Sequence, residues 1–206
     1  ELAAFYQRCL KKIKEATAAR DYLAARQLSA DDIERFGIGY APELRNTIMR
    51  WADKNGFTVE ELVSAGILLP PRGERQADYF DRFKGRIMFP INDVQGRVVA
   101  FSGRILNPAA HPAKYVNSPE TLVFRKSKVL YGLDKARSAL VRHPRREAII
   151  CEGQIDVIRC HAVGIATAVA SQGTALTQDH VELLKRYADT VVILFDSDSA
   201  GRTAAI

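Results

Sequence analysis

The sequence has few of the residues that build a covalently stabilised or membrane-embedded protein. It contains 3 cysteines, at positions 9, 151 and 160, with no C-x-x-C pair. These exclude a disulfide framework and a structural zinc site built from this chain, so the thiols are predicted to be buried small side chains. A functional role for Cys151 would rest only on its place beside Glu152. The longest apolar runs, such as Val191 to Phe195, are far shorter than the roughly 20 residues that span a bilayer.

The N-terminus also lacks the basic stretch and apolar run of a signal peptide, which predicts a cytoplasmic protein without a membrane partner. A composition of 47% apolar and 26% charged residues is that of a globular protein and excludes a disordered or fibrous chain.

Acidic residues are scarce in the middle of the chain, although the net charge of the whole is only +6. Residues 1–69 hold 10 basic and 10 acidic side chains, residues 70–146 hold 16 and 6, and residues 147–206 hold 4 and 8. The three segments therefore carry 0, +10 and −4. This asymmetry predicts a middle segment that faces a polyanion and an acidic end that holds cations.

Local patterns divide the chain in the same way. Residues 1–69 are predicted to be mainly helical, because apolar residues recur at helical spacing from Leu2 onward. Ser29 followed by Asp32, and Thr58 followed by Glu61, are typical of helix N-termini, and Gly56 and Gly66 of helix ends. Residues 70–146 are predicted to mix strands with other structure, including a hairpin of residues 87–91 and 97–101.

One residue constrains that hairpin. Pro90 cannot donate a ladder hydrogen bond, so its strand is predicted to lie at a sheet edge or to pair only in part. Together with residues 70–146, the helical segment is expected to form one domain, residues 1–146.

Residues 147–206 repeat a strand-turn-helix pattern three times, with apolar runs at 148–151, 165–170 and 191–195. Such alternation predicts a parallel sheet covered on both faces in this second domain. The fold class expected for the chain is therefore α/β, with an α+β N-terminal domain before the parallel sheet. Ligands bind beyond the carboxyl ends of such strands, where Glu152, Asp196 and Asp198 stand. Converging carboxylates favour a hard cation, Mg²⁺ or Mn²⁺. By spacing alone, Asp196 and Asp198 could equally cap the helix that begins near Ala200.

These motifs resemble those of a known family, the DnaG-type DNA primases. The segments that carry the resemblance lie in the family's order and cover nearly the whole chain: 22–29 and 36–42, 82–91, 99–104, 114–121, 130–133, 152–158, 170–177 and 195–201. The first six are similar to the basic N-terminal subdomain of the polymerase core, and the last three to its Toprim domain. Gln154-Ile155 and Ser197 depart from the family's frequent residues but leave the carboxylates in place.

The resemblance implies a nucleotidyltransferase that makes RNA primers on single-stranded DNA from ribonucleoside triphosphates, leaving an RNA–DNA hybrid and releasing pyrophosphate. It implies two metal ions, with Asp196 and Asp198 as ligands and Glu152 as a ligand or a group that orders metal-bound water. Asp156, one helical turn beyond Glu152, is expected to support the site, or else to be an exposed helix acid. Arg86, Lys114, Tyr115, Asn117 and Lys126 are expected to contact nucleotide or template, whereas Phe101 and Phe124 are expected to be core.

The resemblance also implies that this chain is a piece of a primase. The family's third acidic motif would follow Ile206, and its zinc-binding module and helicase-binding domain would lie outside the chain. The alternatives are another Toprim enzyme, such as a nuclease or a topoisomerase, or a catalytically inactive fragment that only binds single-stranded DNA.

Overall fold

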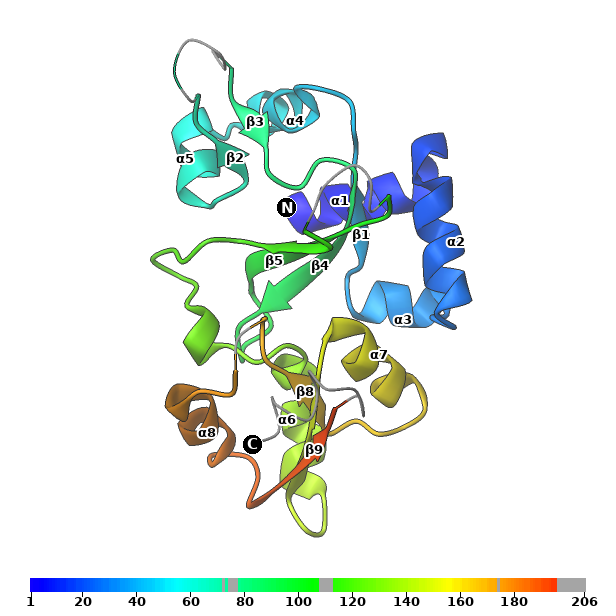
Figure 1. Ribbon diagram of the computed structural model, residues 1–206, viewed down its shortest axis with the longest axis vertical. Helices are drawn as coiled ribbons and strands as arrows, with labels where there is room; N and C mark the ends of the chain where they lie inside the picture. Colours follow the sequence, from blue (N-terminus) through cyan, green and yellow to red (C-terminus); the bar gives the residue numbers. More distant parts are fainter. Residues whose placement is uncertain (72, 74–77, 108–112, 174, 196–206) are drawn as a thin grey trace. The chain divides into compact units, whose positions relative to one another are not determined.

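The computed structural model describes residues 1–71, 73, 78–107, 113–173 and 175–195. The chain forms two compact units that interleave along the sequence (Figure 1). The first unit comprises residues 1–25, 33–90 and 100–121, and the second comprises residues 26–32, 91–99 and those from 122 onward. The predicted domain boundary after residue 146 stays a prediction. Among the described residues, no helix combines the length and the apolar character that a membrane span requires.

The N-terminal segment is helical, as its periodicity predicts. Its helices are α1 (Leu2–Lys12), α2 (Thr17–Ala25), α3 (Ala30–Arg35), α4 (Thr47–Asn55) and α5 (Val59–Ser64), with one 3-10 turn, η1 (Lys14–Ala16). Thr58 and Glu61 form a reciprocal capping box at the start of α5. Gly56, in the left-handed conformation, ends α4, as the sequence predicts.

The first unit is built around a four-stranded sheet in the order β1-β4-β5-β6. These strands are β1 (Gly39–Ala41), β4 (Arg86–Asn92), β5 (Val98–Ile105) and β6 (Tyr115–Asn117), while β2 (Leu68–Leu69) and β3 (Phe80–Asp81) form a separate antiparallel pair. The core beside the sheet includes Tyr6, Trp51, Phe83 and Phe101, which confirms the expectation for Phe101.

The hairpin prediction is confirmed, since β4 and β5 are sheet neighbours joined by a turn at residues 93–97. The strand with Pro90 was predicted to lie at a sheet edge or to pair only in part. The edge alternative does not apply, because β4 lies between β1 and β5. The pairing is partial, however. The short strand β1 pairs with β4 only from Arg86 to Met88, so the ladder on that side ends before Pro90.

The second unit contains the predicted parallel sheet, in the order β8-β7-β9. Its elements are β7 (Glu147–Cys151), β8 (Ala168–Ala170) and β9 (Thr190–Leu194), with helices α6 (Leu133–Arg142), α7 (Gln154–Ala162) and α8 (Gln178–Leu184) and a 3-10 turn, η3 (Lys126–Lys128). The central strand β7 is mostly buried. The apolar residues of β9 are 40–51% exposed. The sequence predicts a sheet covered on both faces, whereas the described residues leave β9 partly exposed.

Candidate metal-binding edge and nucleic-acid interface

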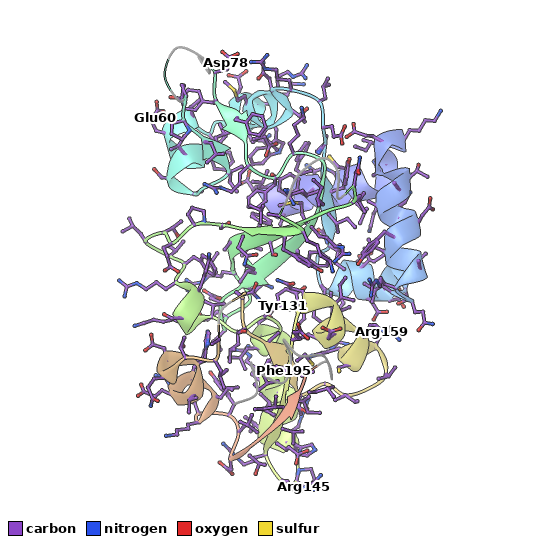
Figure 2. All side chains as sticks on the ribbon, in the orientation of Figure 1. Glu60, Asp78, Tyr131, Arg145, Arg159 and Phe195 are labelled. Carbon is purple, nitrogen blue, oxygen red and sulfur yellow. The ribbon has the colours of Figure 1, made fainter. Side chains whose placement is uncertain are left out.

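Glu152 lies at the carboxyl edge of the parallel sheet in the second unit. It follows Cys151, the last residue of β7, and Cys151 is the register partner of Leu194 at the end of β9. The two strands therefore end at the same edge, and Phe195 follows directly (Figure 2). Glu152 is exposed there. An exposed carboxylate at this edge is a suitable oxygen donor for a hard cation.

The other predicted metal ligands, Asp196 and Asp198, lie outside the described residues. Within the described part of the chain, no three acidic, histidine or cysteine side chains gather into a metal-binding group. The structure therefore places one of the three predicted ligands.

Asp156 lies in the first turn of α7, where its side chain accepts a hydrogen bond at the start of the helix. The backbone N–H of Gly153 donates to Asp156 Oδ2 at 3.2 Å, which satisfies one free donor of the helix N-terminus. Asp156 is exposed. Its predicted support of the metal site stays a prediction.

A buried amide pair, which the sequence did not predict, connects the start of α7 to the loop after β8. Gln154 Nε2 donates to Gln172 Oε1 at 3.0 Å, and both side chains are buried. The pair holds the loop that follows β8 beside the turn that carries Glu152. The signal in the sequence was Gln154 itself, one of the residues that depart from those frequent in the resembled family.

In the first unit, Arg86 is buried, and its guanidinium bonds to backbone carbonyls, while its predicted contact with nucleotide or template stays a prediction. It is 3% exposed, and its Nη1 donates to the carbonyls of Gly103 and Ala113 at 3.3 and 3.2 Å. Burial lowers the pKa of this guanidinium from its usual value. A Cβ on Gly103 would lie 3.0 Å from Arg86 Cδ, so glycine allows the Arg86 side chain to cross β5. The hydrogen bond from Arg86 to the Ala113 carbonyl holds the segment that leads into Lys114.

The other predicted contact residues of this unit lie on strand β6 or directly before it. Lys114 is exposed, while Tyr115 and Asn117 are half-buried and pair with Arg104 and Ser102 of β5. Arg104, absent from the predicted contacts, has its guanidinium carbon 4.5 Å from the centre of the Tyr22 ring and 5.1 Å from that of Tyr115. Its Nη1 donates to the Tyr115 hydroxyl at 2.8 Å. A cation held against two aromatic faces is pre-organised for an anion.

Lys126 belongs to the second unit, where α8 fixes the turn that carries it. His180 Nε2 bonds to the Lys126 carbonyl at 2.8 Å, and the N–H of Thr177 donates to His180 Nδ1 at 3.2 Å. Because Nδ1 accepts, Nε2 carries the proton and the ring is neutral. Thr177 Oγ1 also donates to the Ser127 carbonyl at 2.9 Å. The turn with Lys126 is thus anchored by side chains that the sequence did not single out.

The neutral His180 predicts a loss of stability in acid. Burial lowers the pKa of His180 from its usual 6.5. Below pH 6.5 the unfolded chain binds the proton more readily than the folded chain, so the free energy of unfolding decreases as the pH is lowered. Above pH 6.5 this contribution to stability is fully retained. Thermal unfolding between pH 5 and 7.5 should show a smaller pH dependence for His180→Gln than for the wild type. Equal pH dependence in both proteins would contradict the assignment.

A cavity of about 710 Å³ in the first unit is bordered by basic side chains, Lys84 and Arg86 among them, and by acids that include Asp81. Burial raises the pKa of Asp81 to about 6. The lining of this cavity combines charges of both signs with apolar side chains, so the cavity does not select one class of ligand.

Comparison with known proteins supplies the family. Residues 5–137 match the family model described as "DNA primase catalytic core, N-terminal domain", and residues 149–206 match a Toprim-like model. The chain is 43% identical over 205 residues to a DNA primase of Synechococcus elongatus, covering 98% of this chain and 28% of that protein.

Solved structures agree with the family models. The RNA polymerase domain of Mycobacterium tuberculosis primase DnaG has a TM-score of 0.89 at 38% identity, over 99% of this chain and 66% of that one. A DnaG primase catalytic domain bound to single-stranded DNA has a TM-score of 0.84 at 40% identity, over 99% and 61%. The chain spans less than a third of the length of the curated relative and about two thirds of the solved domains. It belongs to the DnaG primase catalytic-core family.

Proposed function

We propose that the protein to which this chain belongs synthesises short RNA primers on single-stranded DNA in the cytoplasm, joining ribonucleoside triphosphates with release of pyrophosphate. The observation that carries the proposal is the edge of the parallel sheet. Exposed Glu152 follows β7, and the neighbouring parallel strand β9 is followed in the sequence by Asp196 and Asp198. In a chain of the primase core family, this order of carboxylates supports a nucleotidyl-transfer site.

We propose divalent metal ions, Mg²⁺ or Mn²⁺, as cofactors of this edge. The donor set fits, because carboxylate oxygens are the ligands that such hard cations prefer. Asp196, Asp198 and Glu152 would hold the ions, which neutralise negative charge on the reacting phosphates when bound. This chain offers no cysteine set for zinc, so a zinc site would belong to another part of the protein.

The template and nucleotides are proposed to contact Lys114, Tyr115, Asn117 and Lys126. Lys114 and Lys126 suit phosphates as point charges, Tyr115 presents an aromatic ring, and Asn117 offers an amide. We add Arg104, because two tyrosine rings hold its guanidinium in one orientation. Arg86 is proposed to act through the segment that it holds. The RNA–DNA hybrid would contact the same residues, and a replicative helicase would bind elsewhere in the intact protein.

Primer synthesis by the intact protein tests the proposal. It is supplied with single-stranded DNA, four ribonucleoside triphosphates and Mg²⁺ or Mn²⁺, and labelled ribonucleotide incorporation is measured. Metal-dependent, template-dependent incorporation is the expected result. Metal-dependent cleavage of DNA without incorporation would instead support a nuclease. Salt-sensitive DNA binding with no incorporation at any metal concentration would reduce the function to binding.

Lys114→Ala and Lys126→Ala should each weaken the salt dependence of binding to single-stranded DNA. If each lysine neutralises one phosphate, each substitution lowers the slope of log K against log salt by about 0.7. Fluorescence anisotropy of a labelled oligonucleotide at several salt concentrations measures this slope. Lys54→Ala and Lys185→Ala, at exposed lysines of α4 and just after α8, are matched controls that should keep it. An unchanged slope in the Lys114 and Lys126 variants would remove these residues from the interface.

A further inference from the structure

Two cysteine thiols of the second unit lie close together near the carboxyl edge of its parallel sheet. The Sγ atoms of Cys151 and Cys160 lie 3.8 Å apart. Cys151 ends β7 and Cys160 lies on α7, so the strand and the helix point these side chains at each other. A disulfide has an S–S length of about 2.05 Å, so an approach of about 1.8 Å would join the two sulfurs.

The two cysteines differ in access to solvent. Cys151 is 1% exposed, whereas Cys160 is half-buried and precedes the exposed residues Ala162 and Val163 at the end of α7. A small oxidant from solvent therefore reaches Cys160 first, and Cys151 is placed as its resolving partner. Cys9 is buried in the other unit.

We propose that Cys151 and Cys160 are a redox modification site, forming a reversible disulfide when the protein meets hydrogen peroxide. The Cys160 thiolate attacks one peroxide oxygen, the O–O bond breaks, and a sulfenic acid and hydroxide result. The Cys151 sulfur then attacks the sulfenic sulfur, the S–S bond forms, and hydroxide leaves. With the protons from the two thiols, the hydroxides become water. Two thiols lose two electrons and the peroxide gains them, and a dithiol reductant reverses the oxidation by exchange.

The disulfide would bracket the turn that carries Glu152. It would join residues on either side of Glu152 and Gly153, and the closed loop would also contain Asp156. Drawing the end of β7 and α7 together by more than 1 Å would displace that turn. This consequence rests on the proposed function. Since misplacement by 1 Å can cost about a hundredfold in rate, we expect at least a tenfold loss of primer synthesis, restored by reductant.

Peptide mapping of the intact protein tests the chemistry independently of any activity. The protein is treated with hydrogen peroxide, its remaining thiols are alkylated, and it is digested with trypsin without reduction. Cleavage after Arg146, Arg159 and Lys185 puts the two cysteines in separate peptides, 147–159 and 160–185. The expected result is a joined pair of these peptides that dithiothreitol separates. Recovery of both peptides unjoined, with Cys151 alkylated and Cys160 over-oxidised, would overturn the proposal.

Two variants connect the bond to function. Cys160→Ala should lack the joined peptides and keep its primer synthesis in peroxide, while Cys9→Ala should behave like the wild type in both assays. Joined peptides with undiminished synthesis would overturn the regulatory role. Joined peptides in a protein that makes no primers in either redox state would instead count against the proposed function and leave the disulfide standing.

Discussion

Replacing Asp196 and Asp198 together by asparagine is expected to reduce primer synthesis by the intact protein about a hundredfold or more. Asparagine keeps the size of the side chain but removes the charge that holds a divalent cation. Metal ions contribute several kcal/mol to such reactions, and each 1.36 kcal/mol is a factor of ten in rate. Ribonucleotide incorporation on single-stranded DNA measures the rate, and calorimetric titration with Mn²⁺ measures the loss of binding. Glu152→Gln should also impair synthesis, because Glu152 stands exposed at the same sheet edge as the end of β9.

Asp189→Asn is the matched control for this experiment. Asp189 directly precedes β9, whereas Asp196 and Asp198 follow it in the sequence. Its exposed ion pair with Arg146 contributes less than about 1 kcal/mol, so the substitution should leave synthesis close to that of the wild type. If the double variant made primers at the wild-type rate and bound Mn²⁺ unchanged, the metal assignment would be wrong.

The parts of the fold that depend on neighbouring residues could be predicted from the sequence. The capping box of Thr58 and Glu61 needs only side chains three positions apart, and it forms as expected. The parallel sheet could also be predicted, because apolar runs that alternate with helices allow few other arrangements. The place of Glu152 at the sheet edge follows from that alternation alone.

Contacts between residues far apart in the chain could not be predicted in this way. Arg86 carried a binding prediction because the resemblance assigned it to nucleotide or template contact, and its burial against Gly103, 17 positions away, could not be predicted. Arg104 was missed for the same reason, since its partner Tyr22 lies on a helix remote in sequence. Pro90 could be interpreted correctly only in part, because the length of β1 decides whether its missing N–H matters.

Gly39→Ala is expected to destabilise the first unit by about 3 kcal/mol or more, because α1 crosses β1 in direct contact. A Cβ at position 39 would lie 2.5 Å from Tyr6 Cβ and 2.6 Å from the Tyr6 carbonyl carbon. That carbon is helix backbone, which cannot rotate away as a side chain can. Urea unfolding of the chain, followed by the fluorescence of its one tryptophan, Trp51, reports on the core that also contains Tyr6.

Gly153→Ala is the control that separates steric overlap from the general cost of replacing glycine. Neither Gly39 nor Gly153 adopts the left-handed conformation, and a Cβ at Gly153 would meet only Asp156 Oδ2, at 3.6 Å. Its free energy of unfolding should therefore fall by no more than about 1 kcal/mol, the cost of alanine at the N-cap of α7. Equal urea midpoints for the two variants would show that α1 does not approach β1 so closely. A destabilised Gly39→Ala should also bind single-stranded DNA less well, because Ala41 of β1 pairs with Arg86, which holds the segment leading into Lys114.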